Sequence, residues 1–288
     1  MKKTNDIKLK KLLKNKVVLI TGGAGSIGSS LTKTLLDYSV KSIRVFDNNE
    51  HALFKLSHSL NDSRVEPLLG DILNKDRIEL AVLGSDIIIH TAALKNIEIT
   101  EYNPIEAIDV NVNGTINLLK SIIKNKSQIF INISTDKVAE SSTLYGTTKQ
   151  LGERLTNWAG AHINTTKFAT VRLGNIIETR GNVFEVWNEQ IENNLPLTIT
   201  DPKMKRYFFH MNEAVDFIIQ SMLHVNKGEI FVPKMKLHKI TDIASKLSKN
   251  QKIIGPRQGE KLQEILITED EKKISKEKEN MWIIQNYS

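Results

Sequence analysis

The sequence predicts an α/β fold, in which a doubly wound parallel sheet carries a smaller, interleaved C-terminal lobe. Through the first two-thirds of the 288 residues, short apolar runs alternate with helical patterns, as in parallel sheets covered by helices on both faces. A glycine-rich segment directly follows the first apolar run. Beyond about residue 174 the alternation gives way to loops and short helices, which indicates the second lobe.

Five apolar runs are expected to form buried strands, at residues 17–21, 42–46, 86–90, 128–133 and 169–173. They are rich in Ile, Val, Leu and Phe, which is typical of strands buried on both faces. The segment "GDI" at 70–72 is expected to close a further strand, and "GEIFV" at 228–232 resembles a strand in the C-terminal part.

Helical patterns lie between these strands. The segment "SIGSSLTKTLLD" predicts a helix directly after the glycine-rich segment. A longer helix is expected to begin with Asn103 as its N-cap and Pro104 at its first position. Gly114 is expected to bend or loosen that helix, because glycine destabilises a helix interior.

The composition is that of an ordinary soluble globular protein, with 40% hydrophobic and 25% charged residues. No apolar run is long enough to span a bilayer, and the lysine-rich N-terminus does not resemble a secretory signal, so we expect a cytoplasmic protein without a membrane partner. The net charge of +7 is dispersed, which argues against nucleic-acid binding. Cysteine is absent and the seven histidines form no ligand-spaced cluster, so we expect no metal site.

The glycine-rich segment "TGGAGSIG" has the spacing of a dinucleotide-binding turn. Gly22, Gly25 and Gly28 allow a tight turn, close approach of the backbone to a pyrophosphate, and close packing of helix on strand. The phosphates would lie at the helix N-terminus, beside Ser26 and Ile27, where free N–H groups favour anions. Glycine-rich loops are common, but this one lies between a strand and a helix, as a Rossmann-type site requires.

Asp47 ends the second predicted strand, nineteen residues after Gly28. A carboxylate there can bind both hydroxyls of an adenosine ribose and would repel a 2′-phosphate, so we expect NAD, with NADP as the alternative. Capping of the next helix is the other role open to Asp47. Further cofactor contacts are expected beside Asp47 and at the ends of the next strands, from Asn48, Asp71, Ile72, Ala92 and Ala93.

We therefore expect residues 1–173 to form an NAD-binding Rossmann domain, and residues 174–288 to form mainly a substrate-binding lobe with some segments that return to the sheet. Residues 1–15 predict a basic leader helix that places Leu12 and Leu13 on the edge of the core.

The segment "STDKVAESSTLYGTTK" at 134–149 contains two sets of proton-handling groups. Tyr145 has an unperturbed pKa of about 10, and Lys149, one helical turn later, would lower that pKa and hold the nicotinamide ribose. This pair can remove a hydroxyl proton as a hydride leaves its carbon. A 4-ketosugar also makes the proton on carbon 5 acidic, so Lys137, with a lowered pKa, can act as base there. A protonated Asp136 can then assist loss of the hydroxyl from carbon 6. The alternative is that these two form a solvated charge pair.

With these motifs, the chain resembles the extended short-chain dehydrogenase/reductases of the polysaccharide-biosynthesis type. Within them it is most similar to soluble UDP-N-acetylglucosamine 4,6-dehydratases, including the C5-inverting enzyme of pseudaminic acid biosynthesis. The shared motifs extend over nearly the whole chain: "TGGAGSIG", "AALK" with "EYNP", "STDK" with "LYGTTK", "VRLGNIIETRG", "MKRYF", "GEIFVPK" and "GEKLQE". Asp47 and Asn48 replace the serine–arginine pair with which the inverting enzymes bind NADP.

The resemblance implies that Asp136, Lys137 and Tyr145 carry catalysis, that Lys149 positions tyrosine and ribose, and that Thr135 polarises a sugar oxygen. It also implies that Lys95 and Asn111 line or support the nicotinamide region. Residues on the substrate side, which would bind UDP-N-acetylglucosamine or a related UDP-sugar, are Lys95, Asn175, Arg180, Arg206, Arg257 and Glu260. Relatives pair two helices across a dimer, so we expect a homodimer or higher homo-oligomer. The expected reaction is conversion of UDP-N-acetylglucosamine to a UDP-4-keto-6-deoxy sugar. A UDP-sugar 4-epimerase and a catalytically silent NAD- or nucleotide-sensing module are the alternatives.

Overall fold

The computed structural model describes residues 2–179, 181–256, 259–278 and 280–285. Within them the largest element is a nine-stranded sheet. Seven neighbouring strands of this sheet run parallel to one another, in the spatial order β3, β2, β1, β4, β5, β6 and β10. β14 pairs antiparallel with β10, and β13 pairs antiparallel with β14. In spatial order the strands are β13 (Ser275–Lys278), β14 (Met281–Ile284), β10 (Lys227–Pro233), β6 (Lys167–Leu173), β5 (Ile129–Thr135), β4 (Ile87–His90), β1 (Val17–Thr21), β2 (Ser42–Asp47) and β3 (Val65–Leu69).

The predicted doubly wound α/β fold is confirmed. The five strands expected from apolar runs are present as β1, β2, β4, β5 and β6, and "GEIFV" lies in β10. The outer strand β3 contains Pro67, which an edge position tolerates because the missing N–H is not needed there.

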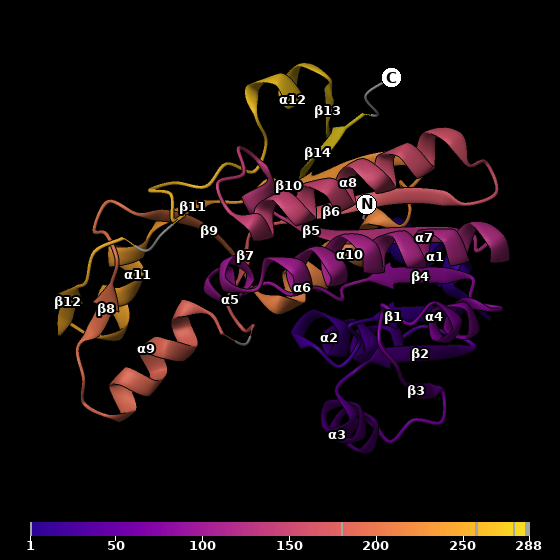
Figure 1. Cartoon of the computed structure of the whole chain (residues 1–288), viewed down its shortest axis with the longest axis horizontal. Helices are drawn as coiled ribbons and strands as arrows, with labels where there is room; N and C mark the ends of the chain where they lie inside the picture. Colours follow the sequence, from indigo (N-terminus) through magenta and orange to yellow (C-terminus); the bar gives the residue numbers. More distant parts are fainter. Residues whose placement is uncertain (1, 180, 257–258, 279, 286–288) are drawn as a thin grey trace.

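Helices cover both faces of the sheet (Figure 1). On one face lie α1 (Lys2–Leu13), α2 (Ser26–Leu35), α3 (Glu50–Leu60) and α10 (Met211–Ser221), which share one apolar core. On the other face α4 (Lys75–Val82), α7 (Gly114–Asn125) and α8 (Leu144–His162) share a second core. Leu13 of the leader helix is buried and Leu12 packs beside it, and Leu9, which was not predicted, is buried as well.

The predicted long helix is interrupted just before Gly114. Short helix α5 (Ile97–Tyr102) precedes α6 (Pro104–Ile108), which leads into a π-helical turn, η1 (Asp109–Asn113), and then into α7. Gly114 has a packing role, because a Cβ atom there would lie 2.7 Å from Ile72 Cγ2. Asn111 lies in this π-helical turn, which is wider than an α-helical turn, and its side chain is buried.

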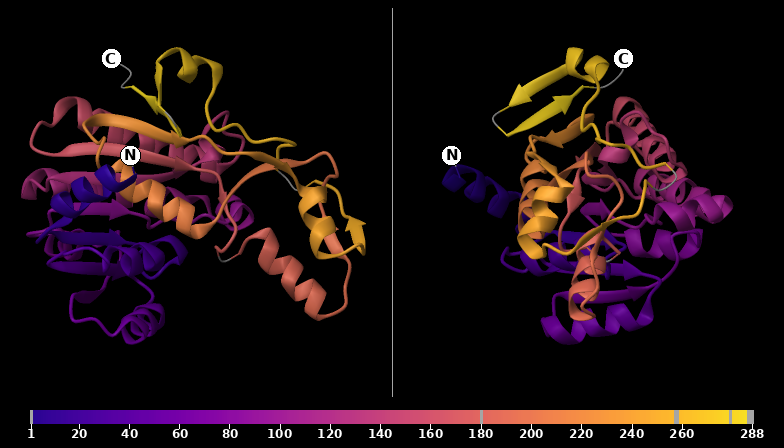
Figure 2. Two further views of the ribbon diagram at one scale, coloured as in Figure 1. Left: turned by 180° about the vertical axis from the view of Figure 1, so that it is seen from behind. Right: turned by 90° about the vertical axis from the view of Figure 1, so that its left-hand side faces the viewer.

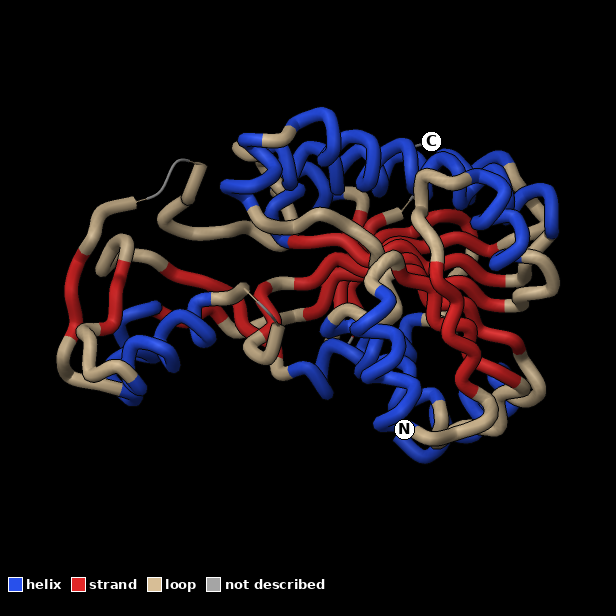
Figure 3. Tube along the Cα trace, turned by 60° about the horizontal axis from the view of Figure 1, so that its bottom comes forward, coloured by secondary structure: helices blue, strands red, loops and turns tan. Residues whose placement is uncertain are grey.

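A smaller lobe lies beyond the carboxyl ends of the strands (Figures 2 and 3). It has its own apolar core around Trp187, to which α9 (Val183–Glu192), β8 (Leu197–Ile199) and α11 (Ile240–Leu247) contribute. β12 (Gln251–Ile253) pairs with β8, while β7 (Asn175–Ile176), β9 (Lys205–Phe209) and β11 (Leu237–Lys239) form a sheet between lobe and main body. The chain returns to the main body in α10, β10, β13 and β14, with α12 (Glu269–Lys273) before the last two.

A buried ion cluster ties the end of the chain to the main body. The guanidinium of Arg172 on β6 donates to both oxygens of Glu153 on α8, at 3.1 and 2.8 Å. It also donates to both oxygens of Glu271 on α12, at 2.9 and 2.7 Å. Burial raises the pKa of Glu271, but its hydrogen bonds and charge interaction with Arg172 dominate and leave that pKa lowered. Arg172 therefore pairs with two carboxylates that the core would otherwise exclude.

Replacement of Arg172 by methionine is expected to lower the free energy of unfolding by about 3–5 kcal/mol, because two carboxylates are left buried without a cation. Urea denaturation followed by circular dichroism measures this change. Lys273→Met, which removes a cation from the exposed pair with Asp270, is the matched control and should change little. A loss in Arg172→Met no larger than in the control would show that the cluster does not stabilise the fold.

Candidate active site

The glycine-rich turn is closely packed against its neighbours. Gly22 has a φ of +65°, and a Cβ atom there would lie 2.6 Å from the backbone of Ala92. A Cβ atom on Gly28 would lie 2.5 Å from the carbonyl oxygen of Gly22. Gly25 is the N-cap of α2, and Ser26 is its first residue. This backbone can therefore approach a ligand at the helix N-terminus without intervening side chains.

Asp47 closes β2 beside this turn. Its carboxylate accepts from the backbone N–H of Ala24 and from that of Asn49, both at 3.0 Å. The predicted capping role therefore goes to Asn49, whose side chain accepts from Ala52 N of α3. Asp47 braces the turn and remains partly exposed, so it can also meet a ligand bound there.

The other residues predicted around the cofactor occupy varied environments. Asn48 and Asp71 are exposed, and Asp71 accepts from Leu73 N at 2.8 Å. Ile72 is buried, with its side chain against Gly114, so it contributes packing. Ala93 lines the large cavity described below.

A buried hydrogen-bond chain runs from the glycine turn to α8. Thr115 donates its hydroxyl hydrogen to the carbonyl of Asn111 at 2.7 Å, so it accepts from Nε2–H of His90 at 3.0 Å. Nδ1 of His90 therefore accepts from the Thr21 hydroxyl at 2.7 Å. The Asn111 amide continues the chain by donating to Thr148 Oγ1 at 3.0 Å. Asn111 is thus buried and bonded to α8, and its predicted role beside the nicotinamide stays a prediction.

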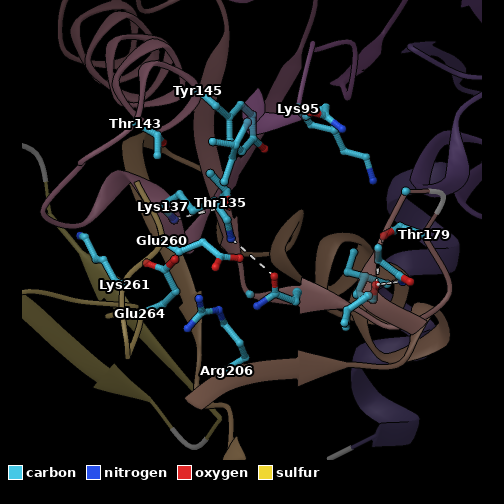
Figure 4. Close-up of a pocket in the computed structure, with 18 of the residues that line it drawn as sticks. Lys95, Thr135, Lys137, Thr143, Tyr145, Thr179, Arg206, Glu260, Lys261 and Glu264 are labelled. Atoms are coloured by element: carbon cyan, nitrogen blue, oxygen red, sulfur yellow. Dashed lines mark hydrogen bonds between the residues drawn. The ribbon is translucent and has the colours of Figure 1, made fainter. Parts of the chain in front are cut away.

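A cavity of about 620 Å³ lies between the ends of β5 and β6 and the smaller lobe (Figure 4). It brings together many of the residues predicted from the sequence. Its walls include Ile27, Ala93, Lys95, Thr135, Lys137, Tyr145, Lys149, Asn175, Arg206 and Glu260. Arg180 and Arg257, which were also predicted to bind substrate, lie outside the described residues.

Asp136 lies beneath the cavity wall and is fully buried. One carboxylate oxygen accepts from Lys137 Nζ at 3.1 Å and from Thr135 Oγ1 at 3.0 Å, and the other accepts from Asn175 Nδ2 at 3.5 Å. The interpretation of Asp136 and Lys137 as a solvated pair is therefore wrong. Asp136 organises three residues that do line the cavity.

The expectation that neighbouring cations lower the pKa of Lys137 is also wrong. Burial lowers that pKa, but the charges of Asp136, Glu264 and Tyr145 outweigh burial and raise it. Burial likewise raises the pKa of Tyr145. Lys137 and a hydrogen bond with Thr135 act in the opposite direction, but the net pKa stays raised. Lys137 therefore acts on the pKa of Tyr145 in this structure, and the role of Lys149 beside Tyr145 stays a prediction. Burial lowers the pKa of Lys149 to about 8.

Sequence reasoning missed two carboxylates that line the cavity, Glu98 and Glu264, and Glu264 ends the motif "GEKLQE". Lys261 in the same motif donates to the carbonyl of Ala139, at 3.1 Å, and so joins this segment to the loop after Lys137. No pattern in the sequence indicates that residues so far apart meet, although the motif itself could have drawn attention to Glu264.

Within the described part of the chain, no group of three or more His, Asp or Glu residues could hold a metal ion. Nor does any described helix combine the length and apolar character needed to cross a membrane.

The fold and the Tyr145–Lys149 pair at the carboxyl ends of the strands define an extended short-chain dehydrogenase/reductase. The family model described as "polysaccharide biosynthesis protein" matches residues 18–286, and the chain belongs to that family. The inverting UDP-N-acetylglucosamine 4,6-dehydratase of Campylobacter jejuni is 36% identical over 281 residues, which cover 95% of this chain and 84% of that protein. A protein of Methanocaldococcus jannaschii, named an uncharacterized membrane protein, is 40% identical over 289 residues, covering 95% of this chain and 87% of that protein. The solved structure of Pen from Bacillus thuringiensis superposes with a TM-score of 0.92 at 34% identity, covering 96% of this chain and 90% of that one.

The buried His90 predicts a specific dependence of stability on pH. Burial, with a smaller effect of Lys149, lowers its pKa from 6.5 to about 3. As the pH falls below about 6.5, the unfolded state therefore binds a proton that the folded state refuses, and stability is lost. Between pH 7 and pH 5 this costs about 2 kcal/mol.

Replacement of His90 by glutamine removes this titration and keeps a side chain with donor and acceptor groups. We expect the wild type to lose about 2 kcal/mol more than His90→Gln between pH 7 and pH 5, measured by urea denaturation. His51→Gln, at an exposed position, serves as control. Parallel pH profiles for wild type and His90→Gln would contradict a neutral, buried imidazole.

Proposed function

We propose that the protein is a UDP-N-acetylglucosamine 4,6-dehydratase, which forms a UDP-4-keto-6-deoxy-N-acetylhexosamine. The observation that carries the proposal is that Thr135, Lys137, Tyr145 and Lys149 line one cavity, with Asp136 bonded directly to Lys137. The Tyr–Lys pair alone suits both a dehydratase and an epimerase. Only the dehydratase needs a second base for carbon 5, and Lys137 supplies it.

The residues around the glycine turn fit NAD. Backbone at Gly22 and Gly28 has no room for side chains, which leaves the helix N-terminus accessible to a pyrophosphate. Asp47 presents a carboxylate where a ribose would lie and would repel the 2′-phosphate of NADP, which is the less favoured alternative. When bound there, NAD would supply the hydride acceptor for oxidation at carbon 4 and the hydride donor for reduction at carbon 6.

The protein's own residues handle the protons. Tyr145 takes the hydroxyl proton of carbon 4, and Thr135 holds the same oxygen. Lys137 must lose its own proton before it can take the proton of carbon 5. Its carboxylate neighbours raise its pKa and so oppose that loss. The rate should therefore rise with pH. Asp136 is buried beneath the cavity wall and acts through Lys137, which it holds at 3.1 Å. Lys137 gives the proton that it took from carbon 5 to the carbon 6 hydroxyl, which leaves as water. Arg206, which lines the cavity, would bind the UDP phosphates.

Incubation with UDP-N-acetylglucosamine in heavy water, followed by mass spectrometry and proton NMR, tests this function. We expect loss of one water and deuterium at carbon 5. An unchanged mass with a new axial hydroxyl at carbon 4 would mean a 4-epimerase. Bound NAD without turnover of any UDP- or dTDP-sugar would mean a nucleotide-sensing module.

Lys137→Met should abolish loss of water, by at least about 10²-fold, because no base then reaches carbon 5. It should still allow oxidation at carbon 4, seen as a rise in absorbance of the reduced cofactor. Product formation at the wild-type rate would overturn the role of Lys137.

We also propose that the protein forms a homodimer through one helical face. Large apolar side chains are exposed together on α5, α6 and α8, which pack against one another. We call this surface the α5–α6–α8 face; it comprises Ile99, Tyr102, Ile105, Ile108, Leu151 and Trp158. A cluster of this kind is unusual on a monomer and typical of an interface.

Trp158, which is 52% exposed, is expected to be covered in the dimer. Trp158→Glu should therefore halve the molar mass measured by light scattering. Phe54→Glu, at an exposed apolar residue on α3, is the matched control and should leave the mass unchanged. An identical mass for wild type and Trp158→Glu would rule out this face.

A further inference from the structure

Glu264 is a buried carboxylate of the cavity that the proposed mechanism leaves without a role. Its residue is 5% exposed and lines the same cavity as Lys137 and Tyr145. Its Oε2 atom has no hydrogen-bond partner within the described residues. A buried carboxylate oxygen without a donor costs free energy, so a donor is expected from a molecule that enters the cavity.

The position of Glu264 is fixed by backbone contacts on both sides. On one side the carbonyl of Leu262 accepts from Lys205 N of β9 at 2.7 Å. On the other side the carbonyl of Leu266 accepts from Arg172 Nη1 at 2.9 Å. Glu264 is therefore held in the cavity wall and cannot move far to find a partner within the protein.

The nearby cations do not satisfy the free oxygen. Lys137 Nζ is bonded to Asp136, and Arg206 Nη1 donates to the carbonyl of Lys205 at 2.9 Å. In Figure 4, Glu264 lies between Lys137 and Arg206. Burial raises the pKa of Glu264, and Asp136 raises it further. The cations Lys137, Arg206 and Lys261 lower it, but the net effect is a raised pKa.

We propose that Glu264 is a further substrate-binding residue, whose free carboxylate oxygen forms a hydrogen bond with a hydroxyl group of the sugar beside Lys137. Asp136 cannot make this contact, because it is fully buried and does not line the cavity. The inference rests on the proposed function, since it takes the ligand to be a nucleotide sugar. It adds a carboxylate to the sugar subsite.

Calorimetric titration of UDP-N-acetylglucosamine and of UDP isolates this contact, because UDP lacks the sugar. Every protein carries Tyr145→Phe, so that no turnover occurs during titration. We expect Glu264→Leu to bind UDP-N-acetylglucosamine about tenfold more weakly, with its affinity for UDP unchanged. Glu192→Leu removes the same charge from an exposed position of α9 outside the cavity and should alter neither affinity.

The pH dependence of water loss gives a second readout, with Tyr145 intact. Asp136, Glu264 and Tyr145 face Lys137 and raise its pKa. Removal of one negative charge in Glu264→Gln lowers that pKa, so the rising limb of the rate should move to lower pH. This variant is nearly isosteric and keeps the test available if Glu264→Leu is destabilised.

An unchanged ratio of the two affinities in Glu264→Leu, with an unmoved limb in Glu264→Gln, would overturn the assignment even if the wild type releases water. A weakened sugar affinity in Glu264→Leu would support it even if the wild type releases none. In that second case the sugar contact stands and the dehydratase is excluded.

Discussion

One buried guanidinium, that of Arg172, joins the parts of the chain that enclose the cavity. It lies on β6 and binds carboxylates on α8 and α12, the helix that follows the segment of Glu264. α8 also carries Tyr145 and Lys149, so the ion cluster joins the helix that bears them to the segment that follows Glu264. Three charges in an apolar interior are tolerated only together. The segments that carry these residues are therefore held together by one set of charge interactions.

A different constraint places the glycine-turn side of the site. There the fit is between backbones, with Gly22 against Ala92, and a chain of hydrogen bonds that passes through the neutral His90. Asn111 continues these hydrogen bonds to α8, where its amide donates to Thr148. The side chain of Asn111 lies in the π turn and is buried. Packing and neutral hydrogen bonds thus fix one side of the site, while charge fixes the other.

Local patterns in the sequence were sufficient for much of this architecture. The parallel strands and the glycine turn depend on neighbouring residues, and Tyr145 and Lys149 are one helical turn apart, so their placement follows from short segments. By contrast, β13 has the sequence "SKEK", which contains no apolar residue. It is a strand because it pairs with β14, and that pairing leaves no local pattern in its sequence. Glu264 escaped prediction because it meets Lys137 only through the tertiary fold.

The charge state of the central residues was also beyond local reasoning. Lys137 was expected to meet cations, but the folded chain surrounds it with Asp136, Glu264 and Tyr145. Asp136 was expected to face the substrate, yet its oxygens are occupied by Thr135, Lys137 and Asn175. Some of these neighbours are adjacent in sequence, but the burial of the pair and the contributions of Glu264 and Asn175 come from the tertiary fold, which no spacing along the chain encodes.

Both edges of the nine-stranded sheet discourage growth by strand addition. At one edge Pro67 withholds an N–H group from any incoming strand. At the other edge, the side chains of Lys276, Glu277 and Lys278 bring alternating charge to the outermost strand. A foreign strand would lose hydrogen bonds at the first edge and bury charges at the second. The molecule therefore keeps an extensive sheet in solution without offering a template for edge-to-edge aggregation.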